Sequence, residues 1–164
     1  MAVKYTKPRG TSDVLPAEMA KWRWLEERFL SVAAHYGYRE TRFPTFEATE
    51  LFQRSVGETT DVVGKEMYTF EDKGGRSITL RPEGTASVVR SVLENGLLQE
   101  RTPLKLCYRA PCFRYEKPQA GRLREFHQLG AEMFGPGGPE SDVELIALMH
   151  GFLSGLGLRD LTLS

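Results

Sequence analysis

The sequence predicts an α+β fold in which an antiparallel β-sheet is flanked by helices. Two β-prone runs, residues 104–115 and 124–134, enclose a short polar loop that contains Pro118 and Gly121, a pattern typical of a hairpin with a long loop. A second pair of β-prone runs encloses a Lys-Gly-Gly turn at residues 73–75. Apolar residues recur at helical spacing between and around these hairpins. Together these observations favour helices packed on antiparallel strands.

Length and charge limit the class of protein. A chain of 164 residues suits a single domain that can bury a core. Its 22 basic and 22 acidic residues argue against a surface coated with nucleic-acid-binding charge. No run approaches the roughly 18 consecutive apolar residues of a membrane span, and the amino terminus lacks an apolar signal core. We therefore expect a soluble, cytoplasmic protein.

Two cysteines, Cys107 and Cys112, lie five residues apart on one predicted strand and so point to opposite faces. They are poorly placed to form a disulfide with each other, and no CxxC spacing indicates a metal site. A reducing compartment and no bound metal are expected.

The first helix is expected to begin near Pro16, after an extended basic segment, and to end at Gly37. Its apolar stripe consists of Met19, Trp22, Leu25, Phe29, Val32 and Tyr36. Trp24 lies off this stripe, which indicates either contact with a partner subunit or partial exposure of a single aromatic side chain.

A strand is predicted over residues 38–47, with Pro44 inside it, and a short helix over 49–57. Proline lacks the amide donor, so this strand belongs at a sheet edge or where pairing is broken. The hairpin around residues 73–75 then leads into a helix that ends at Asn95-Gly96, with an inward face of Val88, Val89, Val92 and Leu93.

Glu83, Gly84 and Thr85 occupy the corner between the second strand of that hairpin and its helix. Thr85 is expected to cap the helix, whereas no such structural role suggests itself for Glu83.

The last helix is expected to open with a capping box, Ser141 and Glu144. Its predicted apolar face consists of Val143, Ile146, Met149, Phe152 and Leu153. His150 lies on this helix without a second ligand nearby, which favours a surface or core role. Residues 158–164 are predicted to form a closing strand.

Alternation along the central hairpin sorts its side chains between two faces. Leu129, Ala131 and Met133 lie with His127 on the core face, and the opposite face carries Phe126, Gln128, Gly130 and Glu132. Gly130 leaves room for something to lie against the sheet between two polar groups. This face is therefore a candidate pocket floor, with a solvated outer sheet face as the alternative. Arg114 and Glu116 are expected to share it.

Charge favours the pocket. The region from 105 to 124 contains Glu116 as its one acidic residue against six basic ones: Lys105, Arg109, Arg114, Lys117, Arg122 and Arg124. A positive loop above carboxylates in the floor suits a ligand that carries both a phosphate and an ammonium group.

The stretch FRYEKPQAGRLREFHQLGAE at 113–132 resembles the second signature motif of class II aminoacyl-tRNA synthetases, in the form found in histidyl-tRNA synthetases. TLRPEGTAS at 79–87 agrees with it, and residues 37–70 resemble the first motif together with the segment that succeeds it in this family. The resemblance implies a partial class II catalytic core over residues 1–164 that activates histidine with ATP and Mg²⁺ and transfers it to tRNA. It also implies a homodimer formed through roughly residues 17–47, although Pro44 could equally blunt a sheet edge.

The resemblance also assigns roles to residues. The histidine-binding residues would be Glu83, Gly84, Thr85, Arg114, Gln128 and Glu132. The ATP-binding residues would be Arg114, Glu116, Arg122 and Phe126, with Arg124 beside them and Lys117 either on the tRNA backbone or merely solvated. Arg114 would be the catalytic residue, because its guanidinium can hold the substrate carboxylate and an α-phosphate oxygen together.

The sequence stops at Ser164, before the family's third motif and anticodon-binding domain, so we expect an amino-terminal part of the enzyme with weak or absent activity. Two alternatives remain. One is the synthetase-like regulatory subunit of ATP phosphoribosyltransferase, whose relatives usually lose the loop residues that are present here. The other is a non-catalytic dimerisation module.

Overall fold

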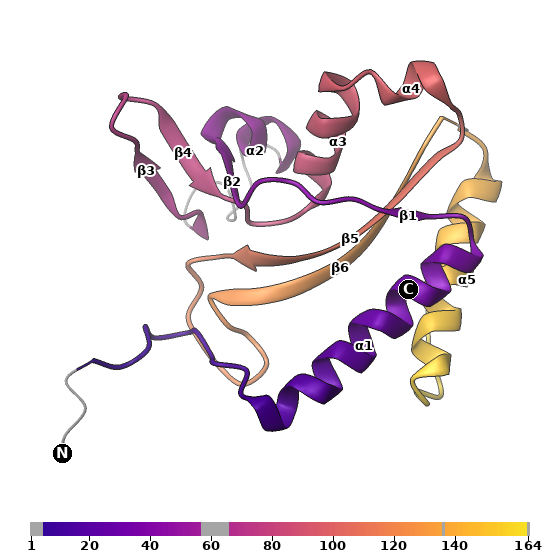
Figure 1. The fold of residues 1–164 in the computed structure, drawn as a ribbon, viewed down its shortest axis with the longest axis horizontal. Coiled ribbons are helices and arrows are strands. Elements are labelled where there is room, and N and C mark those ends of the chain that lie inside the picture. The colour runs from indigo at the N-terminus through magenta and orange to yellow at the C-terminus, as the bar shows by residue number, and fades with distance from the viewer. Residues whose placement is uncertain (1–4, 57–65, 136, 164) are drawn as a thin grey trace.

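A computed structural model describes residues 5–56, 66–135 and 137–163. The part of the first-motif stretch at 57–65 lies outside this range. The elements, labelled in Figure 1, are α1 (Pro16–His35), β1 (Arg39–Glu40), β2 (Phe46–Ala48), α2 (Thr49–Val56), β3 (Thr69–Glu71), β4 (Ser77–Leu80), α3 (Thr85–Glu94), α4 (Leu97–Glu100), β5 (Leu104–Phe113), β6 (Glu125–Phe134) and α5 (Pro139–Gly155).

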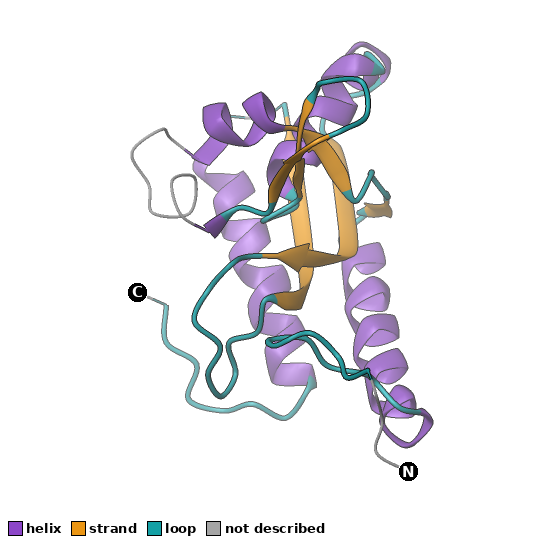
Figure 2. Cartoon of the chain, turned by 90° about the vertical axis from the view of Figure 1, so that its left-hand side faces the viewer, coloured by secondary structure: helices purple, strands orange, loops and turns teal. Residues whose placement is uncertain are grey.

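The described strands form two three-stranded sheets, in the orders β1-β5-β6 and β2-β4-β3. Every pairing is antiparallel except that of β1, which runs parallel to β5. Helices flank the strands, as Figure 2 shows by colour. The predicted fold class and both predicted hairpins are confirmed, with β1 as the one parallel addition.

The central hairpin divides the core between its two faces. On one face, α1 and α5 pack against the strands around Phe29, Cys107 and Phe152. On the other face, α3 packs through Val88 and Val92. The two long helices lie on the same side of the hairpin, with α3 opposite (Figure 1). A sheet covered on both faces explains why β5 is apolar almost throughout.

The strand predicted over residues 38–47 is two strands in different sheets. β1 pairs with β5, whereas β2 pairs with β4. The break contains Pro44, which has no amide hydrogen to donate to a ladder. The proline therefore marks the point where the chain leaves one sheet for the other.

Helix α1 begins at Pro16 and ends before Gly37, whose φ of +82° suits glycine at a helix terminus. Trp24 is 55% exposed, as its place off the stripe predicts. His127 is exposed, with its ring edge-on to that of Trp22 at 4.7 Å between centroids. The expectation that His127 points into the core is wrong, because His127 lies near the start of β6 and its side chain is exposed beside Trp22.

Two of the expected helix faces, those of α3 and α5, are wrong in part. Leu93 is 66% exposed, because Val88 and Val92 set the inward face of α3. In α5 the predicted Phe152 is buried and the predicted Leu153 packs against the same cluster, whereas Val143, Ile146 and Met149 are exposed and Leu148, which was not predicted, is buried. Apolar residues occur around much of α5, so periodicity alone did not single out the buried face.

The predicted capping box is wrong as well. Helix α5 begins at Pro139 after Gly138, which places Ser141 inside the first turn. The Glu144 carboxylate instead accepts a hydrogen bond from Lys105 Nζ at 2.7 Å. Residues 158–163 form no strand, because they pair with no described strand.

Both cysteines are buried and unpaired with each other, as expected. No described helix is long and apolar enough to cross a membrane.

Candidate active site

The candidate site lies where the β6 floor meets the corner between β4 and α3. Gln128 Oε1 accepts a hydrogen bond from the backbone N–H of Gly84 at 2.9 Å. Four residues further along β6, Glu132 Oε1 accepts one from Thr85 Oγ1 at 2.7 Å. Alternation alone placed Gln128 and Glu132 on one face, and these two bonds confirm that they do share it and attach to the same corner.

The space left by Gly130 is filled by the protein itself. Tyr108 is paired with Gly130 across the hairpin and is 1% exposed. A Cβ placed on Gly130 would lie 2.2 Å from Cζ of Tyr108, and one on Gly84 would lie 2.3 Å from Cε2 of the same ring. The expectation that a ligand occupies this space is therefore wrong. The missing side chains instead let the ring fit between the floor and the corner.

Glu83, not Thr85, caps helix α3. The Glu83 carboxylate accepts hydrogen bonds from the backbone N–H groups of Thr85 at 2.6 Å and Ala86 at 2.9 Å. A carboxylate at this position satisfies two of the unpaired amides and complements the helix dipole. The expected Thr85 cap is wrong because the Thr85 hydroxyl is directed to Glu132.

Glu132 is held in an environment that disfavours its charge. Burial raises its pKa above the ordinary glutamate value, the neighbouring Glu83 raises it further, and the hydrogen bond from Thr85 lowers it in part. Two carboxylates at one corner make an acceptor set that suits a cationic or N–H-bearing ligand. Such a ligand would relieve the repulsion between them.

Arg114 stands over the outer end of the floor. Its Nε donates to the carbonyl of Pro82 at 2.9 Å, and its guanidinium lies 5.2 Å from the centre of the Phe126 ring. The predicted sharing of a face by Arg114 and Glu116 is supported, since Nη1 of Arg114 lies 3.9 Å from Oε1 of Glu116.

Glu116 is 6% exposed and also forms an ion pair with Arg122. Its carboxylate therefore lies between two guanidinium groups. The four predicted nucleotide-binding residues, Arg114, Glu116, Arg122 and Phe126, form one connected cluster.

The positive cluster predicted for residues 105–124 is smaller than the sequence implies. Lys105 pairs with Glu144, and Arg109 pairs with both Glu26 and Glu40. Arg109 and Lys105 lie on the face of β5 opposite to Tyr108, and their carboxylate partners come from α1, β1 and α5. Arg114 and Arg122 share the single carboxylate of Glu116, so this group keeps one net positive charge, to which the Arg124 guanidinium over the Tyr115 ring adds.

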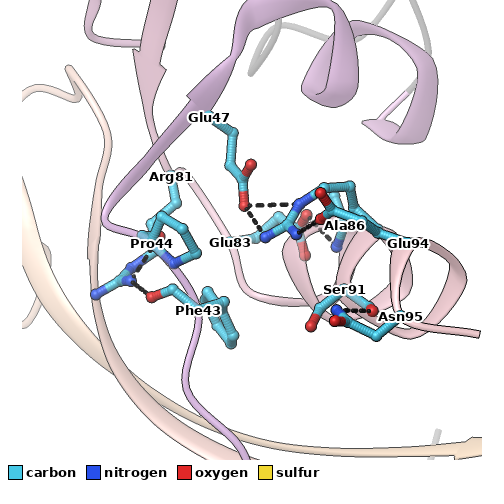
Figure 3. Close-up of polar contacts among 10 residues, drawn as sticks. Phe43, Pro44, Glu47, Arg81, Glu83, Ala86, Ser91, Glu94 and Asn95 are labelled. Atoms are coloured by element: carbon cyan, nitrogen blue, oxygen red, sulfur yellow. Dashed lines mark hydrogen bonds and ion pairs between the residues drawn. The ribbon is translucent and has the colours of Figure 1, made fainter. Parts of the chain in front are cut away.

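Arg81 is a residue that the sequence analysis did not single out. It is 5% exposed, and its guanidinium donates to the carbonyls of Pro111, Phe43 and Pro44 at 2.6, 3.0 and 2.9 Å. Figure 3 shows the two contacts that reach the segment after β1. Arg81 thus ties the corner strand to β5 and to the break at Pro44. Its position two residues before Glu83 was the available signal.

Among the described residues, no three histidine, cysteine or acidic side chains are grouped as a metal site would require.

The family model described as Histidyl-tRNA synthetase matches residues 10–164. A histidine–tRNA ligase of Pelotomaculum thermopropionicum is 56% identical over 158 residues, which is 96% of this chain and 37% of that protein. One from Halothermothrix orenii is 59% identical over 93% of this chain and 36% of its own length. The chain thus spans a little more than a third of the curated relatives that it matches.

Comparison with solved structures indicates the same family as the sequence relatives. The crystal structure of apo S. aureus histidyl-tRNA synthetase matches 94% of this chain and 35% of its own, with a TM-score of 0.80 and 42% identity. An ATP phosphoribosyltransferase regulatory subunit/histidyl-tRNA synthetase from Bacillus halodurans matches 98% of this chain and 40% of its own, with a TM-score of 0.80 and 28% identity. With a family model that matches almost its whole length, the chain belongs to the histidyl-tRNA synthetase family.

Proposed function

We propose that this chain forms part of the class II catalytic domain of a histidine–tRNA ligase, and that it carries the floor of the site where histidine reacts with ATP. The observation that carries the proposal is the joining of an amide and a carboxylate acceptor, Gln128 and Glu132, to the Gly84-Thr85 corner, with Arg114 adjoining them.

The acidic half of the site suits histidine. Oxygen acceptors for the α-ammonium group are available on Glu83, Thr85 and Gln128. The Glu132 carboxylate can accept a hydrogen bond from the N–H of the imidazole ring, a donor that an aliphatic side chain lacks. A site built on buried acceptors discriminates strongly, because an analogue without the donor leaves them unpaired.

The basic half suits ATP. In adenylate formation the histidine carboxylate attacks the α-phosphorus, and negative charge develops on the phosphoryl oxygens as pyrophosphate leaves. The bond from Nε of Arg114 to Pro82 fixes the guanidinium plane, so its remaining N–H groups can be aimed at the carboxylate and an α-phosphate oxygen. Phe126 would stack on adenine, Glu116 would accept its amino group, and Arg122 would contact the distal phosphates. Magnesium bound with ATP would supply further positive charge to the phosphates, beside that of Arg114 and Arg122.

Calorimetric titration tests the proposal. The chain is titrated with histidine, with ATP and with a non-hydrolysable histidyl-adenylate analogue, and the experiment is repeated on Glu132→Ala. The analogue should bind the unaltered chain, and Glu132→Ala should weaken it by about a hundredfold, the loss expected when a buried charged acceptor is removed.

Glu125→Ala is the matched control, because Glu125 is a half-buried glutamate on the same strand with the opposite parity. Equal weakening by both variants would show that the floor has no specific role. A folded chain that binds none of the three ligands would contradict the proposal for this part of the enzyme.

We also propose that the chain pairs with a second copy through roughly residues 17–47 and that it works in the cytoplasm with tRNA as the acceptor. The exposed side chains of Trp24 and Phe46 and the edge strands β1 and β2 support such an interface. The two buried free thiols fit a reducing compartment. Sedimentation of Trp24→Ser should give a lower mass than the unaltered chain at the same concentration.

The likeness to the Bacillus halodurans structure favours one second candidate, a regulatory subunit that binds histidine. Affinity for histidine without affinity for ATP would support it. A dimer that binds neither ligand would support a dimerisation module instead.

A further inference from the structure

The segment before α1 forms a strap, residues 8–14, that lies along the base of the loop between β5 and β6 (Figures 1 and 2). The carbonyl of Gly10 accepts hydrogen bonds from the backbone N–H groups of Arg124 at 2.7 Å and Glu125 at 3.3 Å. The strap itself is turned by bonds from the backbone N–H and the hydroxyl of Thr11 to the carbonyl of Pro8. A carbonyl from the start of the chain therefore holds the root of the loop.

The same backbone connection continues to the candidate catalytic arginine. The carbonyl of Arg124 accepts a hydrogen bond from the N–H of Arg114 at 2.9 Å. Gly10, Arg124 and Arg114 thus lie side by side in one short hydrogen-bonded series. A shift of the strap would reach Arg114 through a single intervening residue.

The side chain of Arg124 repeats this link. Its guanidinium lies 3.9 Å from the centre of the Tyr115 ring, and its Nε donates to the carbonyl of Glu116 at 3.1 Å. Glu116 is the buried carboxylate between Arg114 and Arg122. Arg124 is therefore hydrogen-bonded to the backbone of both residues, to Glu116 through its side chain and to Arg114 through its carbonyl.

Glycine is required at position 10 for two reasons. Its φ is +85°, a conformation that side chains rarely adopt. A Cβ there would also lie 2.8, 2.9 and 3.0 Å from Cγ, Cδ and Cβ of Arg124. These atoms are near the root of the arginine side chain, so relief requires moving the whole side chain off Tyr115 and Glu116.

We infer that Gly10 is a positioning residue for the nucleotide half of the site: the strap holds Arg124, and through it Arg114 and Glu116, in the arrangement that receives ATP. This inference rests on the proposed function. It reaches the histidine half only through Arg114, because the other contacts proposed for histidine come from the corner and the middle of β6.

The test compares Gly10→Ala with Gly37→Ala. Gly37 has a φ of +82°, and a Cβ on it would meet no described atom within 4 Å, so this control carries the same backbone strain without the collision. Amide hydrogen exchange and titration with ATP and with histidine are measured on both variants and on the unaltered chain.

Gly10→Ala should speed exchange at the amides of Arg124, Glu125 and Arg114 and weaken ATP binding about tenfold, the effect of losing one charge-assisted hydrogen bond. The affinity for histidine should fall much less, because Arg114 is only one of the groups proposed to bind it. In an Arg124→Ala background Gly10→Ala should have a smaller further effect on ATP affinity, because the contacts with Cγ and Cδ of Arg124 are gone and only the contact with Cβ and the backbone strain at position 10 remain. Exchange or ATP affinity equal to that of Gly37→Ala would overturn the inference, and so would equal losses for ATP and histidine.

Failure of the proposed function is distinguishable. If the unaltered chain binds no ATP, that function fails for this chain, and exchange at the amide of Arg114 decides whether the strap positions it.

Discussion

Replacing Gly130 with alanine should destabilise the protein even though alanine is the better strand residue. Alanine in place of glycine within a strand gains about 0.5–1 kcal/mol from backbone entropy. Here the new Cβ would lie 2.2 Å from Cζ of Tyr108, whereas carbon atoms in contact prefer about 3.5–4.0 Å. The ring would have to move by about 1.5 Å, and it is confined on its other side by Gly84.

Overpacking of a well-packed core typically costs about 1–3 kcal/mol, and the confinement by two backbones places this site at the upper end. Setting about 3 kcal/mol against a gain of up to about 1 leaves about 2 kcal/mol of net destabilisation. For a chain of this size that corresponds to a fall of about 4–8 °C in Tm. Thermal and urea denaturation would measure it.

Gly137→Ala is the control, because a Cβ there would meet no described atom within 4 Å and Gly137 is not among the glycines of positive φ. Combining Gly130→Ala with Tyr108→Leu should recover part of the loss, because the smaller side chain vacates the space. If Gly130→Ala were as stable as Gly137→Ala, the reasoning about the ring would be refuted.

Three further predictions concern the corner. Glu83→Ala removes the acceptor for two amides at the start of α3 and should lower the free energy of unfolding by about 1 kcal/mol. Hydrogen exchange at the amides of Thr85 and Ala86 should become faster. Unchanged exchange at these amides would contradict the capping role of Glu83. Arg81→Met should lower the free energy of unfolding, measured by urea denaturation, by about 3 kcal/mol or more, because three carbonyls lose their donor. Arg81→Lys should restore little of this loss, since one ammonium group cannot reach all three carbonyls. Full recovery by lysine would show that the geometry of the guanidinium is irrelevant. Because the pKa of Glu132 is raised on folding, its stability contribution falls as pH rises from about 4.3, the pKa of an exposed glutamate, through the raised value. Glu132→Gln should therefore stabilise the protein more at pH 7 than at pH 4, and a difference that does not vary with pH would contradict this.

Alternation and turn residues were sufficient for the central hairpin. Gln128 and Glu132 were placed on one face by parity, and the loop between the strands by Pro118 and Gly121, because both signals act between near neighbours in the chain. The helix face of α5 was predicted only in part, for the opposite reason. Apolar side chains occur around much of α5, and contact with α1 and the sheet selected the face with Leu148 and Phe152.

Some site residues could not be predicted because their partners are distant in sequence. No local signature shows whether the Glu83 carboxylate caps a helix or binds a ligand, and threonine is a common capping residue at the start of a helix. The choice between them followed from Glu132, 47 residues further along the chain, which takes the Thr85 hydroxyl. In the same way Lys105 and Arg109 counted as site charges until their carboxylate partners on other elements were known.

The fold class, the two hairpins, the family and the helices other than α4 could be predicted from the chain alone, because these depend on local periodicity and on motifs that are continuous in sequence. Packing between distant segments settled which space is empty and which charge is free. The gap at Gly130 is filled by Tyr108, the charge of Arg109 is neutralised by Glu26 and Glu40, and the strap at Gly10 lies against Arg124. Each of these outcomes depends on steric fit and desolvation between segments that are far apart along the chain, about which local patterns carry no information.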